Sequence, residues 1–312
     1  MATRQRTTSR PGVTAPRQDR LGPGQWARTL GWRHLVGVVA VAFAVFPAVW
    51  VVSASINPLG TLLSQQFIPD NANLDNYRDL LRGYTDTGLR MPYGKWYLNT
   101  LLVAGGAALA NTFLSAFAAY AFSRMRFKGR RGGLLSVLLV QMFPQTLAFV
   151  AIFLIMIQLG DVFPAIGLGT RLGLLLVYMG GAIGVNTWLM KGFFDTIPTD
   201  LDESARVDGA SHHQVYFRII LPLVTPILAV VFLLSFIFLI NDFILASAVL
   251  GQGSPDDFTL SVGLYRFLND SFSLRWGLFS AGALMAGIPV LILFLFLQRY
   301  IVSGLTQGAV KG

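Results

Sequence analysis

Asp200-Leu201-Asp202-Glu203-Ser204-Ala205-Arg206-Val207-Asp208-Gly209-Ala210-Ser211-His212-His213-Gln214 is a polar stretch that leads into Ile219-Ile220-Leu221-Pro222. It lies between two long apolar runs, in a chain of 312 residues that is 54% hydrophobic and 12% charged. Ordinary soluble domains carry about 25% charged residues, so the composition is that of a membrane protein. A charged segment of this length between apolar runs indicates a surface that docks a partner.

Apolar runs of about 18 residues or more are long enough to cross a bilayer as helices. The sequence contains six such runs, at about 34–56, 96–122, 134–158, 172–192, 219–249 and 278–302. We therefore predict an all-α membrane protein, with a six-span transmembrane domain over 34–303 that is embedded in the lipid bilayer. The polar stretch belongs to the loop 195–218, and residues 304–312 form a C-terminal tail.

The basic residues indicate how the spans are oriented. With the N-terminus inside, 17 of the 24 Lys and Arg residues fall on inner segments and 7 on outer ones. Because basic residues gather on the cytoplasmic side of membrane proteins, both termini are predicted to be cytoplasmic. Residues 1–33 hold seven Arg and one acid, Asp19, and are predicted to be a disordered tail. We interpret its charge as an orientation signal and expect no nucleic-acid partner.

The sequence contains no recognisable set of catalytic or metal-binding residues. It has no Cys, which excludes disulfides, thiolate metal sites and Cys nucleophiles. Residues 83–90 have the glycine spacing of a phosphate-binding loop but lack the Lys and Ser/Thr that follow in such loops. His212 and His213 are helical neighbours that point in different directions, which argues against a metal site. We predict no enzyme activity, no metal and no cofactor.

Asp242, next to Asn241, is the one clear ionisable residue inside a predicted span and lies toward the outer end of the fifth. A carboxylate within the membrane is costly and is expected to face a cavity or a partner. Two interpretations stay open: Asn241 and Asp242 line the path of a polar solute, or Asp242 lies near the outer headgroups. A single acid argues against a proton relay.

The polar stretch itself predicts two short helices joined by a sharp turn. Asp200 with Glu203 is a capping pattern for the first helix, and Gly209 is expected to end it in the left-handed conformation. Ser211 with Gln214 is a capping pattern for the second helix.

Two further expectations concern how this stretch acts. Leu201 and Ala205 share one face of the first helix, which we predict to fit the groove of a partner. The second helix is expected to continue into the fifth span, so that force at the turn reaches Asp242 through one continuous helix.

The spacing of this stretch resembles a known motif. Glu203-Ser204-Ala205, Gly209 after three residues, and then Ile219 and Leu221-Pro222 are similar to the EAA loop of permease subunits in bacterial ATP-driven importers. The spacing match is complete, with Ser204 in place of the second Ala. Leu74–Tyr77, Trp96–Thr100, Ala119–Arg124 and Phe127–Arg130 resemble the sugar-importer branch of that family. The tail, and residues 226–237, resemble the maltose-type second permease subunit.

The resemblance covers nearly the whole chain from about residue 34 and implies an ATP-binding-cassette (ABC) importer of the type I permease fold, in the inner membrane of a bacterium. It implies three kinds of partner besides lipid: a second permease subunit, a pair of ATPase subunits on the cytoplasmic side, and an extracytoplasmic sugar-binding protein. The solute it implies is maltose or a related oligosaccharide. The Arg-rich tail is not part of the family pattern.

The resemblance also implies residue roles. The segment that couples to an ATPase subunit would include Glu203, Ser204, Ala205, Gly209, Leu221 and Pro222. The tail would touch the ATPase pair through Gly308, Lys311 and Gly312, and the outer loop 251–275 would enter the cleft of the binding protein. The competing hypothesis is an ion-coupled secondary transporter that acts without ATPase subunits. A membrane enzyme is a weaker alternative, because no nucleophile and base are paired in the loops.

Overall fold

The structure, a computed structural model, describes residues 31–58, 68–84, 88, 90–181, 183–268 and 275–309. Within these ranges it is helical apart from turns and one isolated β-bridge between Tyr84 and Arg90, and it contains no β-strand. The all-α prediction is therefore confirmed. The chain divides into two compact units, Met1–Trp50 and Val51–Gly312.

Helix α2 (Trp32–Ser55) begins in the first unit and ends in the second. Its 24 residues are apolar almost throughout and include Pro47. At 1.5 Å per residue the helix is about 36 Å long, which exceeds the roughly 30 Å hydrocarbon core of a bilayer. It coincides with the first predicted span, whereas residues 1–30 of the basic tail lie outside the described residues.

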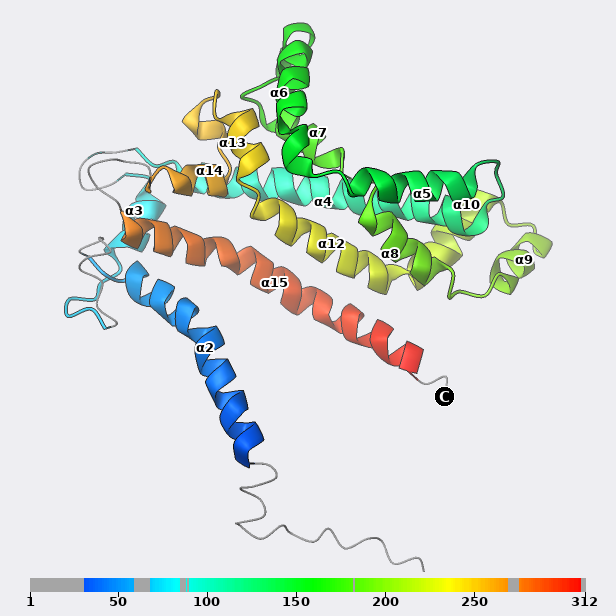
Figure 1. Cartoon of the computed structure of the whole chain (residues 1–312), viewed down its shortest axis with the longest axis horizontal. Helices are drawn as coiled ribbons and strands as arrows, with labels where there is room; N and C mark the ends of the chain where they lie inside the picture. Colours follow the sequence, from blue (N-terminus) through cyan, green and yellow to red (C-terminus); the bar gives the residue numbers. More distant parts are fainter. Residues whose placement is uncertain are drawn as a thin grey trace, which may run out of the picture. The chain divides into compact units, whose positions relative to one another are not determined.

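Helix α4 (Tyr93–Arg124) is the long central helix of the second unit (Figure 1). It packs against α7 (Arg171–Met179), α8 (Val185–Phe194) and α12 (Thr225–Ile240), and α12 also packs against α15 (Trp276–Ala309). Many of the buried residues of α4 are small, which lets neighbouring helices approach closely where lipid offers no hydrophobic drive. The short helix α3 (Asp75–Arg82) packs against α15 and α4.

Two separate apolar cores form along α4 and α12. One contains Trp96, Leu174 and Phe236, together with residues of α13 (Ile244–Leu250) and α14 (Leu260–Tyr265). The other contains Tyr120, Phe194 and Ile220 and lies at the opposite end of α4. Because both cores draw on the same two helices, α4 and α12 tie the two ends of this unit together.

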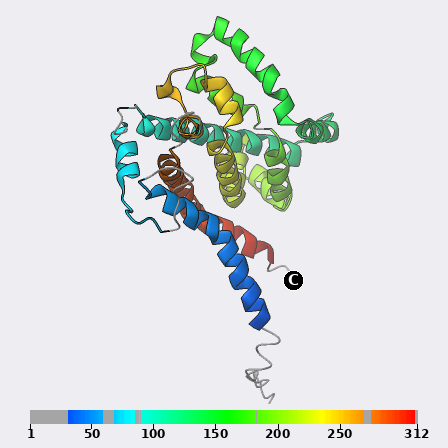
Figure 2. The ribbon, with the colours of Figure 1, turned by 60° about the vertical axis from the view of Figure 1, so that its left-hand side comes forward.

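The third and fourth predicted spans are each built from two shorter helices. The third consists of α5 (Arg130–Gln141) and α6 (Gln145–Val162), separated at Pro144, which has no backbone N–H to continue a helix. Figures 1 and 2 show α6 leaving the unit at a steep angle to α4. The fourth consists of α7 and α8, separated by residues 180–184. A 3-10 turn, η3 (Pro164–Ile166), precedes α7.

The fifth predicted span is not one continuous helix, which corrects our expectation. It comprises a π-helix, η4 (Val215–Ile220), the short α11 (Leu221–Leu223), α12 and α13. The axes before and after Val224 differ by 74°. Pro222 and Pro226 flank this bend, and neither has a backbone N–H to continue the hydrogen bonding of a helix, so the helix changes direction there.

By length and composition, three described helices are able to cross a membrane: α2, α4 and the residues of α15 up to Tyr300. The bent pair His212–Leu223 and Thr225–Ile240 makes a fourth if it counts as one span, and the apolar part of α6 is shorter. The presence of several spans agrees with the predicted class of fold. The count of six, and the assignment of 34–303 to one transmembrane domain, stay predictions.

Candidate functional site

The polar stretch folds into a helix, a turn and a second helix, which we call the docking turn (residues 200–214). Helix α9 (Asp200–Val207) has Asp208 at its C-cap and is followed by Gly209, whose φ of +85° is the left-handed conformation predicted for it. The N–H of Ala210 donates to the carbonyl of Ala205 over 2.9 Å, and the N–H of Gly209 donates to that of Arg206 over 3.0 Å. These two bonds are the Schellman pattern that closes a helix C-terminus.

The second helix, α10 (His212–Gln214), begins with the predicted capping box. The Ser211 hydroxyl accepts the N–H of Gln214 at 3.3 Å, and the side chain of Gln214 accepts the N–H of Ser211 at 2.8 Å. The first helix differs from expectation, because Asp200 is its first residue rather than its cap. Thr199 holds the cap position in helical geometry, which keeps its side chain from capping, and it makes no such bond.

The exposed face of α9 differs from the predicted one. Ala205 is buried in the chain's own core, so it cannot offer an apolar face to a partner together with Leu201. Glu203 and Ser204 are exposed, and Leu201 is 43% exposed. Val207 is 88% exposed, and sequence reasoning missed it. The surface that α9 makes available to a partner is therefore formed by its exposed residues, Asp200, Leu201, Glu203, Ser204, Arg206 and Val207.

Leu221 and Pro222 lie in α11, directly before the 74° bend. Leu221 is half-buried and Pro222 is exposed. The structure thus places these two motif residues at the junction between the docking turn and α12, away from the exposed face of α9. Their role in coupling stays a prediction.

A buried ion pair holds α9 against α4. Arg124, the last residue of α4, has its Nε 2.9 Å from Oδ2 of Asp202, and both side chains are almost fully buried. Arg124 also donates from its terminal nitrogen to the carbonyl of Ile197 over 2.7 Å. Sequence analysis counted Arg124 only as an orientation signal, and its burial beside Asp202 was not visible in the pattern of charges.

A second polar contact joins α4 to the segment before α9. Ser123 donates to one carboxylate oxygen of Asp195 over 2.6 Å, and Lys191 donates to the other over 2.5 Å. Burial would raise the pKa of Asp195, but these two hydrogen bonds and the nearby positive charges hold it below its usual range. Beside these contacts lies a pocket of about 740 Å³ with a mostly charged lining, which includes Arg124, Arg126, Arg130, Asp202, Glu203 and Arg206.

Asn241 and Asp242 lie at the break between α12 and α13, outside regular helix. Asp242 Oδ2 accepts the Tyr178 hydroxyl and the N–H of Ala246, both at 2.9 Å. Asp242 lines two pockets, of about 510 and 540 Å³. The carboxylate therefore has a structural role that sequence reasoning did not include, and its place on a solute path stays a prediction.

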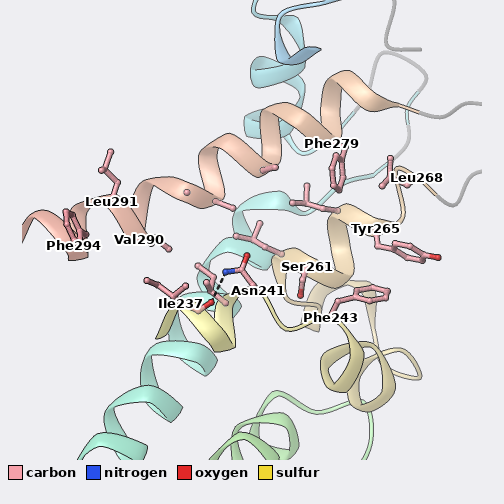
Figure 3. Close-up of a pocket in the computed structure, with 16 residues that line it drawn as sticks. Ile237, Asn241, Phe243, Ser261, Tyr265, Leu268, Phe279, Val290, Leu291 and Phe294 are labelled. Atoms are coloured by element: carbon pink, nitrogen blue, oxygen red, sulfur yellow. Dashed lines mark hydrogen bonds between the residues drawn. The ribbon is translucent and has the colours of Figure 1, made fainter. Parts of the chain in front are cut away.

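Asn241 also lines a pocket of about 720 Å³ between α12, α14 and α15 (Figure 3). Its amide donates to the carbonyl of Ile237 over 2.7 Å, and Ser261 donates to the carbonyl of Asp242 over 2.7 Å. The ring of Tyr265 lies beside that of Phe243, with centroids 4.6 Å apart. A largely apolar lining with a few polar groups is typical of small-molecule sites.

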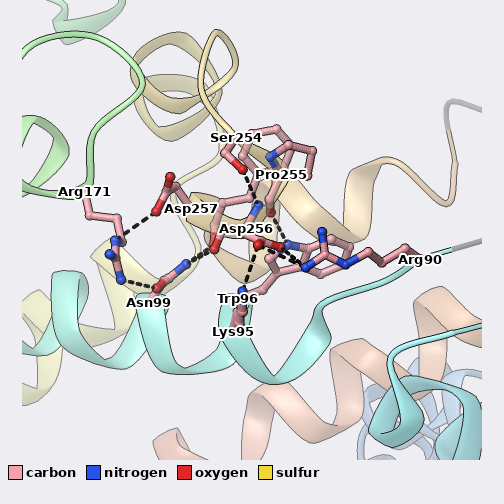
Figure 4. Close-up of polar contacts among 10 residues, drawn as sticks. Arg90, Lys95, Trp96, Asn99, Arg171, Ser254, Pro255, Asp256 and Asp257 are labelled. Carbon is pink, nitrogen blue, oxygen red and sulfur yellow. Dashed lines mark hydrogen bonds and ion pairs between the residues drawn. The ribbon is translucent and has the colours of Figure 1, made fainter.

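The segment between α13 and α14 is anchored on the first turns of α4 (Figure 4). It contains a 3-10 turn, η5 (Pro255–Asp257). Asp256 Oδ2 accepts bonds from Lys95 at 2.7 Å and from Arg90 at 3.0 Å, and Asp257 pairs with Arg171 at 3.2 Å. The hydrogen bond from Lys95, with that from Arg90, holds the pKa of Asp256 below its usual range.

The backbone of this segment is bound to α4 as well. Trp96 donates from its indole to the carbonyl of Pro255 over 2.7 Å. Asn99 donates to the carbonyls of Asp256 and Phe258, at 2.8 and 3.0 Å, and the Thr100 hydroxyl accepts the N–H of Leu260 at 2.7 Å. We call residues 255–260 the anchored loop. It is part of the predicted outer loop 251–275, of which residues 269–274 lie outside the described residues.

The tail residues that the resemblance implied are only partly covered. Gly308 lies within α15, and Lys311 and Gly312 lie outside the described residues. Their contact with ATPase subunits stays a prediction.

Comparison with known proteins identifies the class. The chain belongs to the family described as binding-protein-dependent transport system inner membrane component, whose family model matches residues 111–307. The family is a transport component of the inner membrane and not a catalytic enzyme.

Two curated relatives and one solved structure are similar over most of the chain. The galactooligosaccharides transport system permease protein GanQ of Bacillus subtilis (strain 168) is 41% identical over 279 residues, which cover 89% of this chain and 94% of that protein. The maltose/maltodextrin transport system permease protein MalG of Escherichia coli (strain K12) is 39% identical over 286 residues, 89% of this chain and 95% of that protein.

The solved structure is a bacterial ABC transporter involved in the import of the acidic polysaccharide alginate. It superposes with a TM-score of 0.71 at 25% identity, and covers 90% of this chain and 99% of that chain. The chain is therefore an ABC importer permease by family and by fold, as the resemblance implied.

Proposed function

We propose that this chain is the permease subunit of an importer for maltose or a related oligosaccharide. It pairs with a second permease subunit, binds two ATPase subunits from the cytoplasmic side, and receives sugar from an extracytoplasmic binding protein. The family description and the oligosaccharides named for the two curated relatives support this proposal. The observation that carries it is the docking turn, whose exposed Glu203 and Ser204 stand on a helix closed by Gly209.

The proposed mechanism acts through this turn. The exposed face of α9 enters a cleft of an ATPase subunit, and ATP-driven closure of the ATPase pair moves the turn. That movement shifts the spans from an inward-open to an outward-open arrangement. Asn241 and Asp242, which line the pockets at the end of α12, are the candidate residues on the path of the sugar. ATP hydrolysis takes place in the partner subunits.

The proposed orientation puts both termini and the docking turn in the cytoplasm, with the anchored loop outside. The absence of Cys makes this directly testable, because a single introduced Cys is a unique labelling site. A membrane-impermeant maleimide is expected to label Gln252→Cys in intact cells and Lys128→Cys only in inverted vesicles, since both positions are exposed and Lys128 lies on an inner segment outside the docking turn. Labelling of Lys128→Cys in intact cells contradicts the orientation.

The test of function uses the full complex in proteoliposomes, with the second permease, the ATPase and the binding protein of the same organism. Gly209→Asp is expected to abolish ATP-dependent uptake of radiolabelled maltose or maltotriose while the subunit stays in the membrane. Gly129→Asp is the matched control, because Gly129 also has a positive φ and open space around it but lies outside the docking turn. Normal uptake by the Gly209→Asp complex contradicts the docking role.

The same vesicles distinguish the competing hypothesis and the sugar. Uptake by this subunit alone, driven by an ion gradient and without ATPase subunits, identifies a secondary transporter and overturns the proposal. Uptake of galactooligosaccharides in place of maltose keeps the ABC permease and changes only the solute.

A further inference from the structure

We propose that α4 couples the docking turn to the anchored loop, as a single helix that is ion-paired with α9 at its inner end and hydrogen-bonded to residues 255–260 at its outer end. Arg124 and Asp202 are the positioning residues at the inner end, and Trp96, Asn99 and Thr100 are those at the outer end. The inference rests on the proposed function, in which the docking turn meets the ATPase and the outer loop meets the binding protein.

The inner connection joins α9 to α4 through buried charge. Asp202 and Ala205 are the buried residues of α9, and the rest of the helix is exposed. Asp202 is paired with Arg124 at 2.9 Å, and Arg124 also binds the carbonyl of Ile197 just before α9. The end of α4 is thus ion-paired with α9 and hydrogen-bonded to the segment that leads into it.

A buried ion pair of this kind fixes position more than it adds stability. Bringing two charges out of water costs about as much as their attraction returns, whereas removing one partner leaves the other charge buried and uncompensated. Asp202 Oδ1 is buried and has no hydrogen-bond partner among the described residues, so the carboxylate relies strongly on Arg124. If α9 moved without Arg124, the carboxylate of Asp202 would stay buried without its partner, which is unfavourable in free energy. The two residues are therefore expected to move together.

The outer connection is made by three residues close together near the start of the same helix. Trp96, Asn99 and Thr100 together bind three carbonyls and one N–H of the anchored loop, at distances between 2.7 and 3.0 Å. Trp96, Asn99 and Thr100 are buried, so these bonds are shielded from water. The backbone of the loop is consequently fixed to α4 at several points, and not by surface charges alone.

The alternative route, through the fifth predicted span, is interrupted three times. It contains the π-helix η4, the 74° bend at Val224 and the break at Asn241. Helix α4 has no Pro and runs without interruption for 32 residues, about 48 Å at 1.5 Å per residue (Figure 1). A continuous helix with bonds at both ends transmits a displacement more directly than a segmented one.

The coupling has a definite consequence for the transport cycle. When ATPase closure displaces α9, Arg124 carries α4 with it, and Trp96, Asn99 and Thr100 carry the anchored loop. By linkage, a binding protein that holds the loop in one position favours one position of the docking turn. A displacement therefore passes along α4 in either direction. Stimulation of ATP hydrolysis by the binding protein is accordingly expected to depend on the contacts at both ends of α4.

The test uses the full complex in proteoliposomes, with a fluorophore on Gln252→Cys beside the anchored loop. The wild-type background is expected to show an ATP-dependent change in fluorescence and stimulation of ATP hydrolysis by the liganded binding protein. Asp202→Asn is expected to lower both responses by about tenfold, which is within the usual range of coupling between sites. Asp161→Asn is the matched control, because Asp161 is an exposed carboxylate that lies outside the docking turn and the anchored loop.

Two further variants separate coupling from folding. The exchange Arg124→Asp with Asp202→Arg restores opposite charges and is expected to recover part of the fluorescence change, which a merely local defect would not allow. Asn99→Ala leaves the docking turn untouched and is expected to lose binding-protein stimulation while ATPase subunits still copurify. If Asp202→Asn complexes do not assemble, the comparison of Asn99→Ala with the wild type still tests whether α4 couples the two sites.

The outcomes are distinct from those of the proposed function. An unchanged ATP-dependent signal in Asp202→Asn or in Asn99→Ala overturns the coupling role of α4, whichever sugar is carried. Failure of the wild-type complex to import any oligosaccharide overturns the proposed solute and leaves the fluorescence comparison valid.

Discussion

Tyr178 donates its phenolic hydrogen to Asp242 over 2.9 Å and so joins α7 to the break between α12 and α13. The same carboxylate oxygen accepts the N–H of Ala246 and thereby satisfies a free backbone donor at the start of α13. The acid that is most conspicuous in the sequence of the spans thus holds two helices in place, in addition to lining two pockets.

Tyr178→Phe is expected to destabilise the protein by about 1–2 kcal/mol, because it removes one hydrogen bond to a partly buried carboxylate and leaves the ring in place. The measurement is the midpoint of thermal unfolding of the detergent-purified complex. Tyr265→Phe is the control, since the side chain of Tyr265 is 44% exposed. Equal midpoints for the two variants argue against a structural role of the Tyr178–Asp242 bond.

Substitutions of Gly209 are expected to be tolerated in the order Asn, Ala, Val. Nothing lies within 4 Å of a Cβ placed at Gly209, so the cost comes from the φ of +85° and not from a clash. Asn adopts the left-handed conformation readily. For Ala that conformation costs about 1–2 kcal/mol of free energy, and for a β-branched residue it costs more. ATP-dependent uptake and limited proteolysis at the docking turn report the series. A Val variant as active as the Asn variant contradicts the conformational requirement.

Gly263→Ala is expected to disturb the anchored loop by about 1–3 kcal/mol through overpacking. A Cβ at Gly263 would overlap the indole ring of Trp96, which is 1% exposed and donates to the carbonyl of Pro255. Faster proteolysis of the loop and a lower unfolding midpoint are the expected results. Gly192→Ala is the control, because no atom lies within 4 Å of its Cβ, and a mid-helix Ala is neutral or stabilising there.

The pH dependence of the loop follows from Asp256, whose pKa is lowered chiefly by its hydrogen bond from Lys95. A lowered folded-state pKa contributes stability that is present above the unfolded value of about 3.9 and is lost as the pH falls through the folded value. Because the thiolate is the reacting form, the reactivity of Gln252→Cys is compared at each pH with that of a free thiol, and this ratio is expected to stay constant between about pH 8 and pH 5. In an Asp256→Asn background the Cys is expected to react faster throughout that range. A transition between pH 7 and pH 5 in the wild-type background contradicts this assignment.

The course of the chain through the second unit was predictable where a helix is long and apolar. Residues 96–122 and 278–302 form single helices, because nothing in their sequences interrupts the hydrogen bonding of the backbone for more than a turn. Pro289 lies inside α15 without ending it, whereas Pro144 separates α5 from α6. Hydropathy reports how apolar a segment is and not where tertiary packing bends it, so the 74° change of direction at Val224 was missed.

The part of the docking turn that depends on residues close together in the sequence was predictable. Gly209 and the pair Ser211 and Gln214 act through bonds to residues within five positions, and these bonds form as predicted. The position of Ala205 depends on how α9 packs against η4 and α4, and Arg124 lies far from Asp202 in the sequence. The periodicity of an eight-residue helix does not indicate which of its faces is buried, so the orientation of α9 was predicted wrongly.

The ion pair between Arg124 and Asp202 sets a condition on exchanging parts between related transporters. The docking turn folds through its own bonds, so a graft of residues 199–214 into another permease carries its shape with it. The graft does not include the attachment of α9 to α4, because Arg124 lies in α4 and outside the grafted residues. A chimaera therefore needs both charges to come from one parent, and the two sites are expected to change together when one transporter diverges from another.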